Sequence, residues 1–351
     1  MTPPPSRATG AWATRLYRLV LRAYPRAFRE EYADEMALLF HDTYRAATQH
    51  ADPFSTLQFW VRLVGDVGTS VCREHITHLM HQGWLARALA GREPLTMALQ
   101  FTLDVAQHTD IGRARPSNED NLITVVPTDP QQLQTKGALF VVSDGLGGHS
   151  RGEVASEMAV QGVRDAYYQN SHDDIPTALQ ASLTAANSAI FQANERLRAQ
   201  PGNAGEMGAT CVAAVLHAHM LYVANVGDSR VYVLHQGQLR QITRDHSIVA
   251  QMVERGELTP AAARTHEQRN IIYRSLGRAT VEVDSFALEV AEDDAVIHCT
   301  DGLSGVLGDE EVRAIVAQYP PAESVQRLIA SANAAGGPDN VTAIVVRVTG
   351  A

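Results

Sequence analysis

Leu139-Phe-Val-Val-Ser-Asp-Gly-Leu-Gly-Gly-His-Ser150 is the stretch from which the fold can be worked out. The apolar run 138–142 predicts a buried β-strand, which we expect to end at Asp144-Gly145. A carboxylate at a strand end suits a hard cation, because its oxygen is a ligand and the following glycine lets a backbone carbonyl approach closely. A single Asp-Gly pair more often marks an ordinary turn, so the interpretation depends on further acidic residues.

A second pair of this kind, Asp301-Gly302, follows the apolar run 295–299. Other acidic residues lie beside glycine or asparagine at the ends of predicted strands: Glu119, Asp120, Asp228 and Asp339. If the strands pack in sheets, several of these ends meet at one rim, where the carboxylates cannot all stay ionised without counter-charge. Divalent cations supply that charge, and an all-oxygen ligand set favours Mg²⁺ or Mn²⁺ over Zn²⁺.

Two such ions about 4 Å apart would hold a bridging water as hydroxide and present it to a phosphorus atom. Arg115 lies in the same polar loop as Glu119. A guanidinium beside a metal pair is a good bidentate ligand for phosphate, although an ordinary solvated arginine is an equally open interpretation. The sequence therefore indicates hydrolysis of a phosphate monoester at a two-metal centre.

The charge of the chain is unevenly distributed. Residues 1–95 carry 11 arginines and 9 acidic residues, whereas the remainder carries 18 basic and 30 acidic residues, for a net charge of -10 overall. A hydrophobic content of 45% is typical of a globular protein. The acidic C-terminal part argues against nucleic acid as the main ligand and is compatible with cation binding.

Three cysteines that are far apart in the sequence, Cys72, Cys211 and Cys299, predict free thiols in a reducing cytoplasm. The run 11–25 is interrupted by arginines, so we expect no signal peptide. No stretch reaches the roughly 18 uninterrupted apolar residues that a membrane span needs. We therefore expect a cytoplasmic protein.

The N-terminal part has a helical pattern. Aromatic and apolar residues recur every four positions at Tyr24, Phe28, Tyr32, Met36 and Phe40. This spacing places them on one helix face, and it predicts a small all-α module over residues 1–82. Glycines and a proline mark residues 83–98 as a linker, and a larger domain is expected over 99–351.

In the larger domain the predicted strands and helices fall into separate groups. Strands are expected near 99–106, 122–126, 138–142, 210–216, 220–226, 231–234, 284–288, 295–299 and 341–348. Helices are expected near 150–168, 176–199, 247–255, 309–318 and 322–334. Because this order is not a repeating βαβ pattern, it favours an α+β fold with helices outside the sheets.

Five short motifs resemble those of the metal-dependent, type 2C Ser/Thr protein phosphatases in their bacterial form. They are Arg-x-x-Asn-Glu-Asp (115–120), Asp-Gly-x-Gly-Gly-His (144–149), Gly-Asp-Ser-Arg (227–230), Thr-Asp-Gly-Leu (300–303) and Gly-Gly-Pro-Asp-Asn (336–340). They follow the family's order and cover about 100–350. The resemblance implies a four-layer α-β-β-α sandwich with two antiparallel sheets and the metal ions at one edge.

The resemblance also implies a role for each matching residue. Asp144 would bridge two core ions, and the Gly145 carbonyl would bind the first. Asp301 and Asp339 would hold the second ion, and Glu119 and Asp120 would support the ligands and waters. Asp228 would help hold a possible third ion, Arg115 would bind the substrate phosphate, and Asn340 would orient Asp339. Residues 244–280 would form the family's mobile flap.

The implied substrates are phosphoserine and phosphothreonine proteins, the products of bacterial Ser/Thr kinases. Two alternatives remain: a catalytically silent binding or signalling protein with the same scaffold, and a phosphatase of a partner-switching anti-sigma system. The segment from Leu16 to Met36 is similar to a helical prefix of bacterial ABC-transporter permeases. That similarity suggests a module that docks on a protein or a membrane complex.

Overall fold

The computed structural model describes residues 101–147, 151–172, 174–199 and 206–350, together with Tyr17, Leu21 and Phe40. The chain divides into two compact units, Met1–Leu95 and Thr96–Ala351. In the first unit these three residues are buried, and the rings of Tyr17 and Phe40 stack with centroids 4.3 Å apart. The remainder of the expected module (1–82) and linker (83–98) lies outside the described residues, so their boundaries remain predictions.

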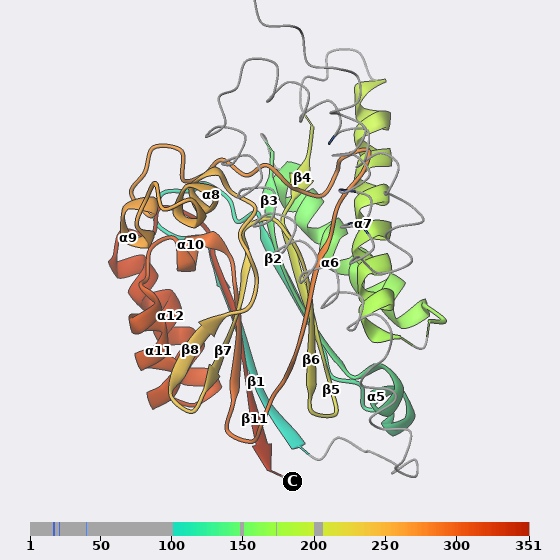
Figure 1. Cartoon of the computed structure of the whole chain (residues 1–351), viewed down its shortest axis with the longest axis vertical. Helices are drawn as coiled ribbons and strands as arrows, with labels where there is room; N and C mark the ends of the chain where they lie inside the picture. Colours follow the sequence, from blue (N-terminus) through green and yellow to red (C-terminus); the bar gives the residue numbers. More distant parts are fainter. Residues whose placement is uncertain are drawn as a thin grey trace, which may run out of the picture. The chain divides into compact units, whose positions relative to one another are not determined.

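Two antiparallel sheets form the centre of the second unit (Figure 1). The first sheet contains, in spatial order, β1 (Phe101–Asp110), β11 (Val341–Gly350), β10 (Ala295–Cys299), β7 (Arg230–His235) and β8 (Gln238–Gln241). The second contains β2 (Asp120–Val125), β3 (Ala138–Leu146), β5 (Cys211–His217), β6 (Met220–Val226) and β9 (Asp284–Glu289), with the short β4 (Gly208–Ala209) paired to β3.

Helices cover the outer face of each sheet (Figure 1). The second sheet packs against α6 (Arg151–Gln169) and α7 (Ile175–Arg198), and the first packs against α11 (Asp309–Gln318) and α12 (Pro321–Ala334). Four shorter helices complete the described part: α5 (Pro130–Lys136), α8 (Ile248–Glu254), α9 (Pro260–Ala263) and α10 (Asp301–Ser304). None of the helices in the described residues is both long and apolar enough to cross a membrane.

Three buried clusters fill the three spaces between these four layers, and alternation along the strands determines which side chain enters which cluster. In β3, Leu139 and Val141 join the cluster beneath α6 and α7. Their neighbours Phe140 and Val142 join the cluster between the two sheets. The third cluster lies beneath α11 and α12 and includes Val345 of β11. The predicted four-layer α-β-β-α sandwich is confirmed.

The strand boundaries differ from the prediction at the C-terminal end of β3, which carries Asp144. Strand β3 does not end at Asp144-Gly145 but continues to Leu146, because Gly145 and Leu146 pair with β4. Such a long-range partner leaves no local signal in the sequence. The sequence also gave no indication of the short helices α5 and α10. Helix α10 begins at Asp301, directly after β10, with Thr300 at the N-cap position.

Candidate metal centre

The acidic residues expected from the sequence meet where the two sheets come together. Asp120, the first residue of β2, lies directly opposite Asp144 of β3 in the antiparallel register. Thr300, which follows β10 of the other sheet, donates a hydrogen bond from Oγ1 to Asp120 Oδ2 at 2.8 Å. Since Asp301 is the next residue, this bond brings acids from both sheets to one site.

A glycine follows each of two central aspartates because neighbouring backbone lies too close for a side chain. A Cβ on Gly145 would lie 2.1 Å from the Gly152 carbonyl oxygen at the start of α6. A Cβ on Gly302 would lie 1.8 Å from the Asn340 carbonyl oxygen. The two glycines therefore allow α6 to approach Asp144, and allow α10 to approach the segment that carries Asp339.

The carboxylates raise one another's pKa. Burial first, and then the charges of its acidic neighbours Asp301 and Asp339, raise the pKa of Asp120 to about 7. Burial and the charge of Asp339 raise the pKa of Asp301 to about 6. The pKa values of Asp144 and Asp228 are well above the usual range for the same two causes. The site thus holds several acids that lack sufficient positive charge around them.

Arg115 brings positive charge to this cluster. Its Nη2 donates to Asp339 Oδ2 at 2.7 Å, and this bond raises the pKa of the guanidinium above its usual value. The side chain remains 47% exposed, compared with 22% for Asp339. A guanidinium with this exposure beside buried carboxylates can reach an incoming anion.

Asn340 holds the loop that carries Arg115. Its Nδ2 donates to the carbonyl oxygens of Ile111 and Ser117, both at 2.9 Å, and its Oδ1 accepts from the Glu119 amide at 2.8 Å. Its backbone amide donates to Asp339 Oδ1 at 2.9 Å. Asn340 therefore contacts Asp339 only through its backbone amide, and its side chain fixes the loop, a role that the sequence analysis missed.

Glu119 lies against the start of α6. Its carbonyl oxygen accepts hydrogen bonds from the Gly145 amide at 3.1 Å and from Ser156 Oγ at 2.5 Å. A Cβ on Gly152 would lie 2.3 Å from Glu119 Oε2. Burial raises the pKa of this carboxyl, so Glu119 adds a partly buried acid at the edge of the cluster.

The donors of this cluster fit hard divalent cations. Asp120 Oδ1 and Asp301 Oδ1 are buried and have no hydrogen-bond partner among the described residues. Burying a carboxylate oxygen without a partner is costly, and a divalent cation removes that cost. Across 101–147, 151–172, 174–199 and 206–350, no three His, Cys, Asp or Glu side chains are spaced as a ready-formed metal site. The acids are therefore close enough to interact electrostatically, but they do not form a completed coordination sphere.

Buried hydroxyl groups support the backbone beside Asp144 and Asp228. The Asp144 amide donates to Thr210 Oγ1 at 2.9 Å, and this hydroxyl is hydrogen-bonded to Ser229 Oγ at 2.7 Å. Ser229 directly follows Asp228 in the turn between β6 and β7. The two hydroxyls thus link the backbone at Asp144 to the residue that follows Asp228. No local pattern in the sequence predicted this contact.

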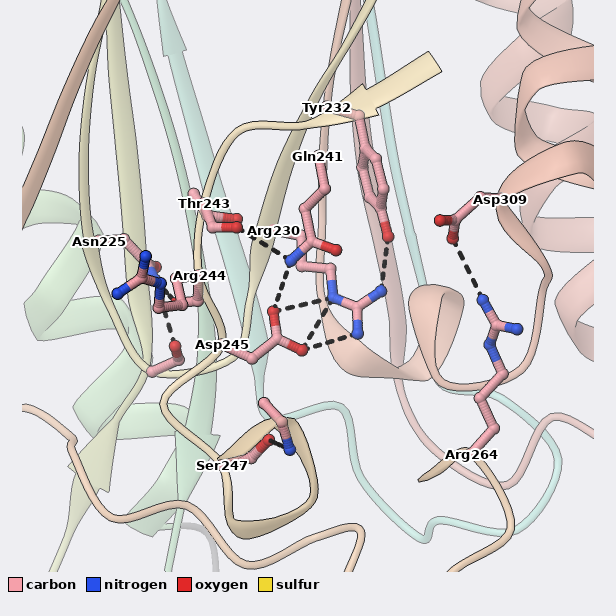
Figure 2. Close-up of polar contacts among 12 residues, drawn as sticks. Asn225, Arg230, Tyr232, Gln241, Thr243, Arg244, Asp245, Ser247, Arg264 and Asp309 are labelled. Carbon is pink, nitrogen blue, oxygen red and sulfur yellow. Dashed lines mark hydrogen bonds and ion pairs between the residues drawn. The ribbon is translucent and has the colours of Figure 1, made fainter. Parts of the chain in front are cut away.

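A partly buried ion pair fixes the segment expected to act as a flap (Figure 2). The Arg230 Nη2 atom lies 2.7 Å from Asp245 Oδ2, and Arg230 Nη1 donates to the Tyr232 hydroxyl at 2.7 Å. Gln241 Nε2 donates to the other oxygen of Asp245 at 2.8 Å. Farther along the flap, Arg264 forms an exposed ion pair with Asp309 of α11 at 3.1 Å. The flap is thus held at its base by a partly buried ion pair and farther along by an exposed one. Other contacts add to these, among them the bond from the Gly227 amide to His246 Nδ1 at 3.0 Å and the Arg274–Asp284 ion pair at 2.7 Å.

Comparison with known proteins points to one family. A sequence model described as Protein phosphatase 2C matches residues 129–343. The serine/threonine phosphatase stp of Listeria monocytogenes is 36% identical over 244 residues, which cover 68% of this chain and 93% of that protein. The serine/threonine protein phosphatase PstP of Mycobacterium tuberculosis is 34% identical over 254 residues, covering 72% of this chain and 46% of that protein.

Solved structures show the same similarity. The catalytic domain of PstP in complex with two manganese ions superimposes with a TM-score of 0.61 at 34% identity, over 71% of this chain and 99% of that one. The serine/threonine phosphatase Stp1 of Staphylococcus aureus gives a TM-score of 0.64 at 30% identity, over 74% of this chain and 100% of that one.

Proposed function

The chain belongs to the protein phosphatase 2C family, and on this basis we propose that it is a metal-dependent protein serine/threonine phosphatase. The observation that carries the proposal is the meeting of acids from both sheets through the Thr300–Asp120 contact. Buried oxygens without partners at Asp120 and Asp301 support it, because such atoms call for cations. Two manganese ions in the similar PstP structure support Mn²⁺ or Mg²⁺ as the cofactor.

Each acid has a proposed role at the metal centre. Asp144 would contribute to both core ions, and the Gly145 carbonyl oxygen would bind the first. Asp301 and Asp339 would hold the second ion, and Asp228 would help hold a third. Glu119 and Asp120 would support the waters and ligands around the first. When bound, the ions supply a water with a lowered pKa as the nucleophile and neutralise charge on the phosphate.

Arg115 binds the phosphate of the substrate. In the absence of other partners its guanidinium pairs with Asp339. The side chain is also 47% exposed, so the guanidinium can reach phosphate oxygens. Two parallel hydrogen bonds from the planar group then orient the phosphorus atom for in-line attack.

The proposed substrates are phosphorylated proteins. Proteins phosphorylated by bacterial Ser/Thr kinases in the cytoplasm are the specific class that we propose, because the similar proteins carry the names of bacterial serine/threonine phosphatases. Residues 99–351 form the catalytic domain in this proposal, and residues 1–82 form a docking module joined by the linker 83–98. A chain that begins at residue 96 should then hydrolyse a small phosphate ester as fast as the full chain does.

A catalytically silent scaffold is the main alternative. The retention of all the expected acids weighs against it, because a protein without metal chemistry gains nothing from burying unpartnered carboxylates. An anti-sigma phosphatase would differ only in its substrate, so the phosphoprotein that accumulates when the gene is deleted would distinguish it.

Metal-dependent turnover tests the proposal directly. The purified chain is assayed with p-nitrophenyl phosphate and with a phosphothreonine peptide, in Mn²⁺, in Mg²⁺ and in EDTA. We expect turnover with Mn²⁺ and none in EDTA, and Asp301→Asn should abolish it. Asp165→Asn is the matched control, because Asp165 is an exposed acid on α6. Turnover that persists in EDTA would exclude the metal mechanism, and folded protein that is inactive with every metal would favour the silent scaffold.

A further inference from the structure

Thr300 lies between β10 and α10 and is completely buried. Its hydroxyl has two partners. The backbone amide of Thr342 donates to Oγ1 at 3.1 Å, and Oγ1 lies 2.8 Å from Asp120 Oδ2. Because an amide can only donate, the single hydroxyl hydrogen of Thr300 is left for the carboxylate. The Thr342 amide of β11 therefore favours the arrangement in which the Thr300 hydroxyl donates its hydrogen to Asp120.

The two carboxylate oxygens of Asp120 differ in their hydrogen bonding. Oδ2 accepts from Thr300, whereas Oδ1 is buried and has no partner of good hydrogen-bond geometry among the described residues. Burial raises the pKa of this carboxyl, and the nearby hydroxyls of Thr342 and Thr300 both act to lower it. The whole residue is 5% exposed, so solvent does not satisfy the second oxygen. A carboxylate held through one oxygen presents the other in a fixed orientation, which lowers the entropy cost of binding a cation or its water.

We propose that Thr300 is a positioning residue: its hydroxyl fixes Asp120 so that Oδ1 stays available to the metal centre. This inference rests on the proposed metal-dependent function and extends it to a residue that touches neither the cations nor the substrate. The Thr300 amide donates separately to the Thr342 carbonyl oxygen at 3.2 Å. A change from Thr to Val keeps the shape and this backbone bond, and it removes the hydroxyl together with its bonds to Asp120 and to the Thr342 amide.

Thr243 provides a matched control. Its hydroxyl is also buried and also accepts a hydrogen bond from a strand amide, that of Val231 at 3.1 Å. Thr243→Val therefore removes the same type of amide–hydroxyl bond as Thr300→Val, but among the described residues the Thr243 hydroxyl makes no hydrogen bond to an acid. If Thr300 were important only for folding, the two variants would behave alike.

Titration calorimetry with Mn²⁺ on EDTA-stripped, buffer-exchanged protein tests the proposal. We expect Thr300→Val to weaken Mn²⁺ binding by about tenfold or more, as the loss of partners behind metal ligands commonly does. Thr300→Ser, which keeps the hydroxyl, should remain within about threefold of the wild type, and Thr243→Val should bind as the wild type does. Should Thr300→Val fail to fold, Thr300→Ala serves with the same expectation.

A double-mutant cycle shows whether the effect passes through Asp120. Adding Thr300→Val to Asp120→Asn should change Mn²⁺ affinity by less than about twofold, since the carboxylate that the hydroxyl positions is already gone. Unchanged affinity in Thr300→Val, equal losses in Thr243→Val, or full additivity in the cycle would each overturn the inference. A wild-type chain that binds no Mn²⁺ and hydrolyses no ester would instead overturn the proposed function, and this inference with it.

Discussion

Asp120 and Asp144 are register partners across the antiparallel pair β2–β3. Directly opposed residues share one face of a sheet, with Cβ atoms about 5 Å apart. A shift of the register by one residue would move one of the two carboxylates to the opposite face. The strand pairing itself therefore places two acids side by side, and burial raises the pKa of both. The pairing of β2 with β3 in the second sheet is therefore enough to place these two carboxylates side by side. Thr300 and the acid that follows it, Asp301, come from the end of β10 in the first sheet.

The first prediction concerns pH and the metal-free protein. The pKa of Asp120 rises from an ordinary 3.8 to about 7 on folding, so between these values the native state binds more protons than the unfolded state. The contribution of Asp120 to the free energy of unfolding then falls as pH rises, and it reaches its minimum above the folded-state pKa. Asp120→Asn mimics the protonated form, so its advantage in melting temperature over the wild type in EDTA should grow from pH 5 to pH 7.5.

Differential scanning fluorimetry checks this, and we expect the difference to increase by at least about 2 °C. Comparison with Asp120→Asn cancels the opposite contribution of His246, whose pKa burial lowers. Addition of Mn²⁺ should reverse the order at pH 7.5, because only the carboxylate binds the cation strongly. A constant difference across the pH range would show that Asp120 is already ionised in the metal-free fold.

The second prediction separates the acids by their roles. Asp144→Asn should reduce kcat by about a thousandfold or more, because in the proposed metal centre both core ions depend on that carboxylate. Asp228→Asn should cost much less, and it should raise the Mn²⁺ concentration that gives half-maximal activity. Steady-state kinetics over a range of Mn²⁺ concentrations measures both effects. Equal losses in the two variants would argue against a separate third site at Asp228.

The third prediction concerns Arg115. Lysine keeps the charge but not the planar fork, so Arg115→Lys should raise KM for a phosphopeptide more than it lowers kcat. Arg115→Met removes the charge and should also free Asp339 from its ion pair. Kinetics with a phosphothreonine peptide at saturating Mn²⁺ measures the effect. A fall in kcat with unchanged KM would place Arg115 in the transition state only.

The sequence revealed the acids but not the way they are held. Asp144 and Asp301 could be identified because each follows an apolar run and precedes a glycine. The order of strands and helices also followed from the sequence, since strands buried on both faces, such as β3, contain continuous apolar runs. The Thr300–Asp120 bond spans 180 positions and Asn340 reaches loop residues more than 220 positions away, so neither contact leaves a local pattern.

The fourth prediction tests the close packing behind Asp301. Gly302→Ala places a Cβ where the Asn340 carbonyl oxygen now lies, so α10 or the Asp339 segment must move. We expect a loss of about 2–4 kcal/mol in stability, together with weaker Mn²⁺ binding. Gly308→Ala is the control, because a Cβ there meets nothing within 4 Å. Denaturant unfolding of both variants measures the loss in unfolding free energy. Similar losses in the two would mean that the backbone near Gly302 moves to accept a Cβ at little cost.

The fifth prediction compares the two ion pairs of the flap, both visible in Figure 2. The Asp245 side chain is 10% exposed and its partner Arg230 20%, whereas Asp309 is 58% exposed. Removing one partner of a buried pair leaves an uncompensated charge, so Asp245→Asn should cost about 3 kcal/mol in unfolding free energy. Asp309→Asn should cost about 0.5 kcal/mol or less, because solvent already screens that pair.

Urea unfolding in EDTA measures both losses, and activity in Mn²⁺ adds a second readout. Asp245 and Arg230 both act on the pKa of Asp228, so Asp245→Asn should also change the Mn²⁺ concentration that the enzyme requires. Asp309→Asn should leave hydrolysis of p-nitrophenyl phosphate unchanged, because neither Asp309 nor its partner Arg264 belongs to the proposed metal centre. If the two substitutions cost the same, the Arg230–Asp245 pair is open to solvent and does not fix the base of the flap.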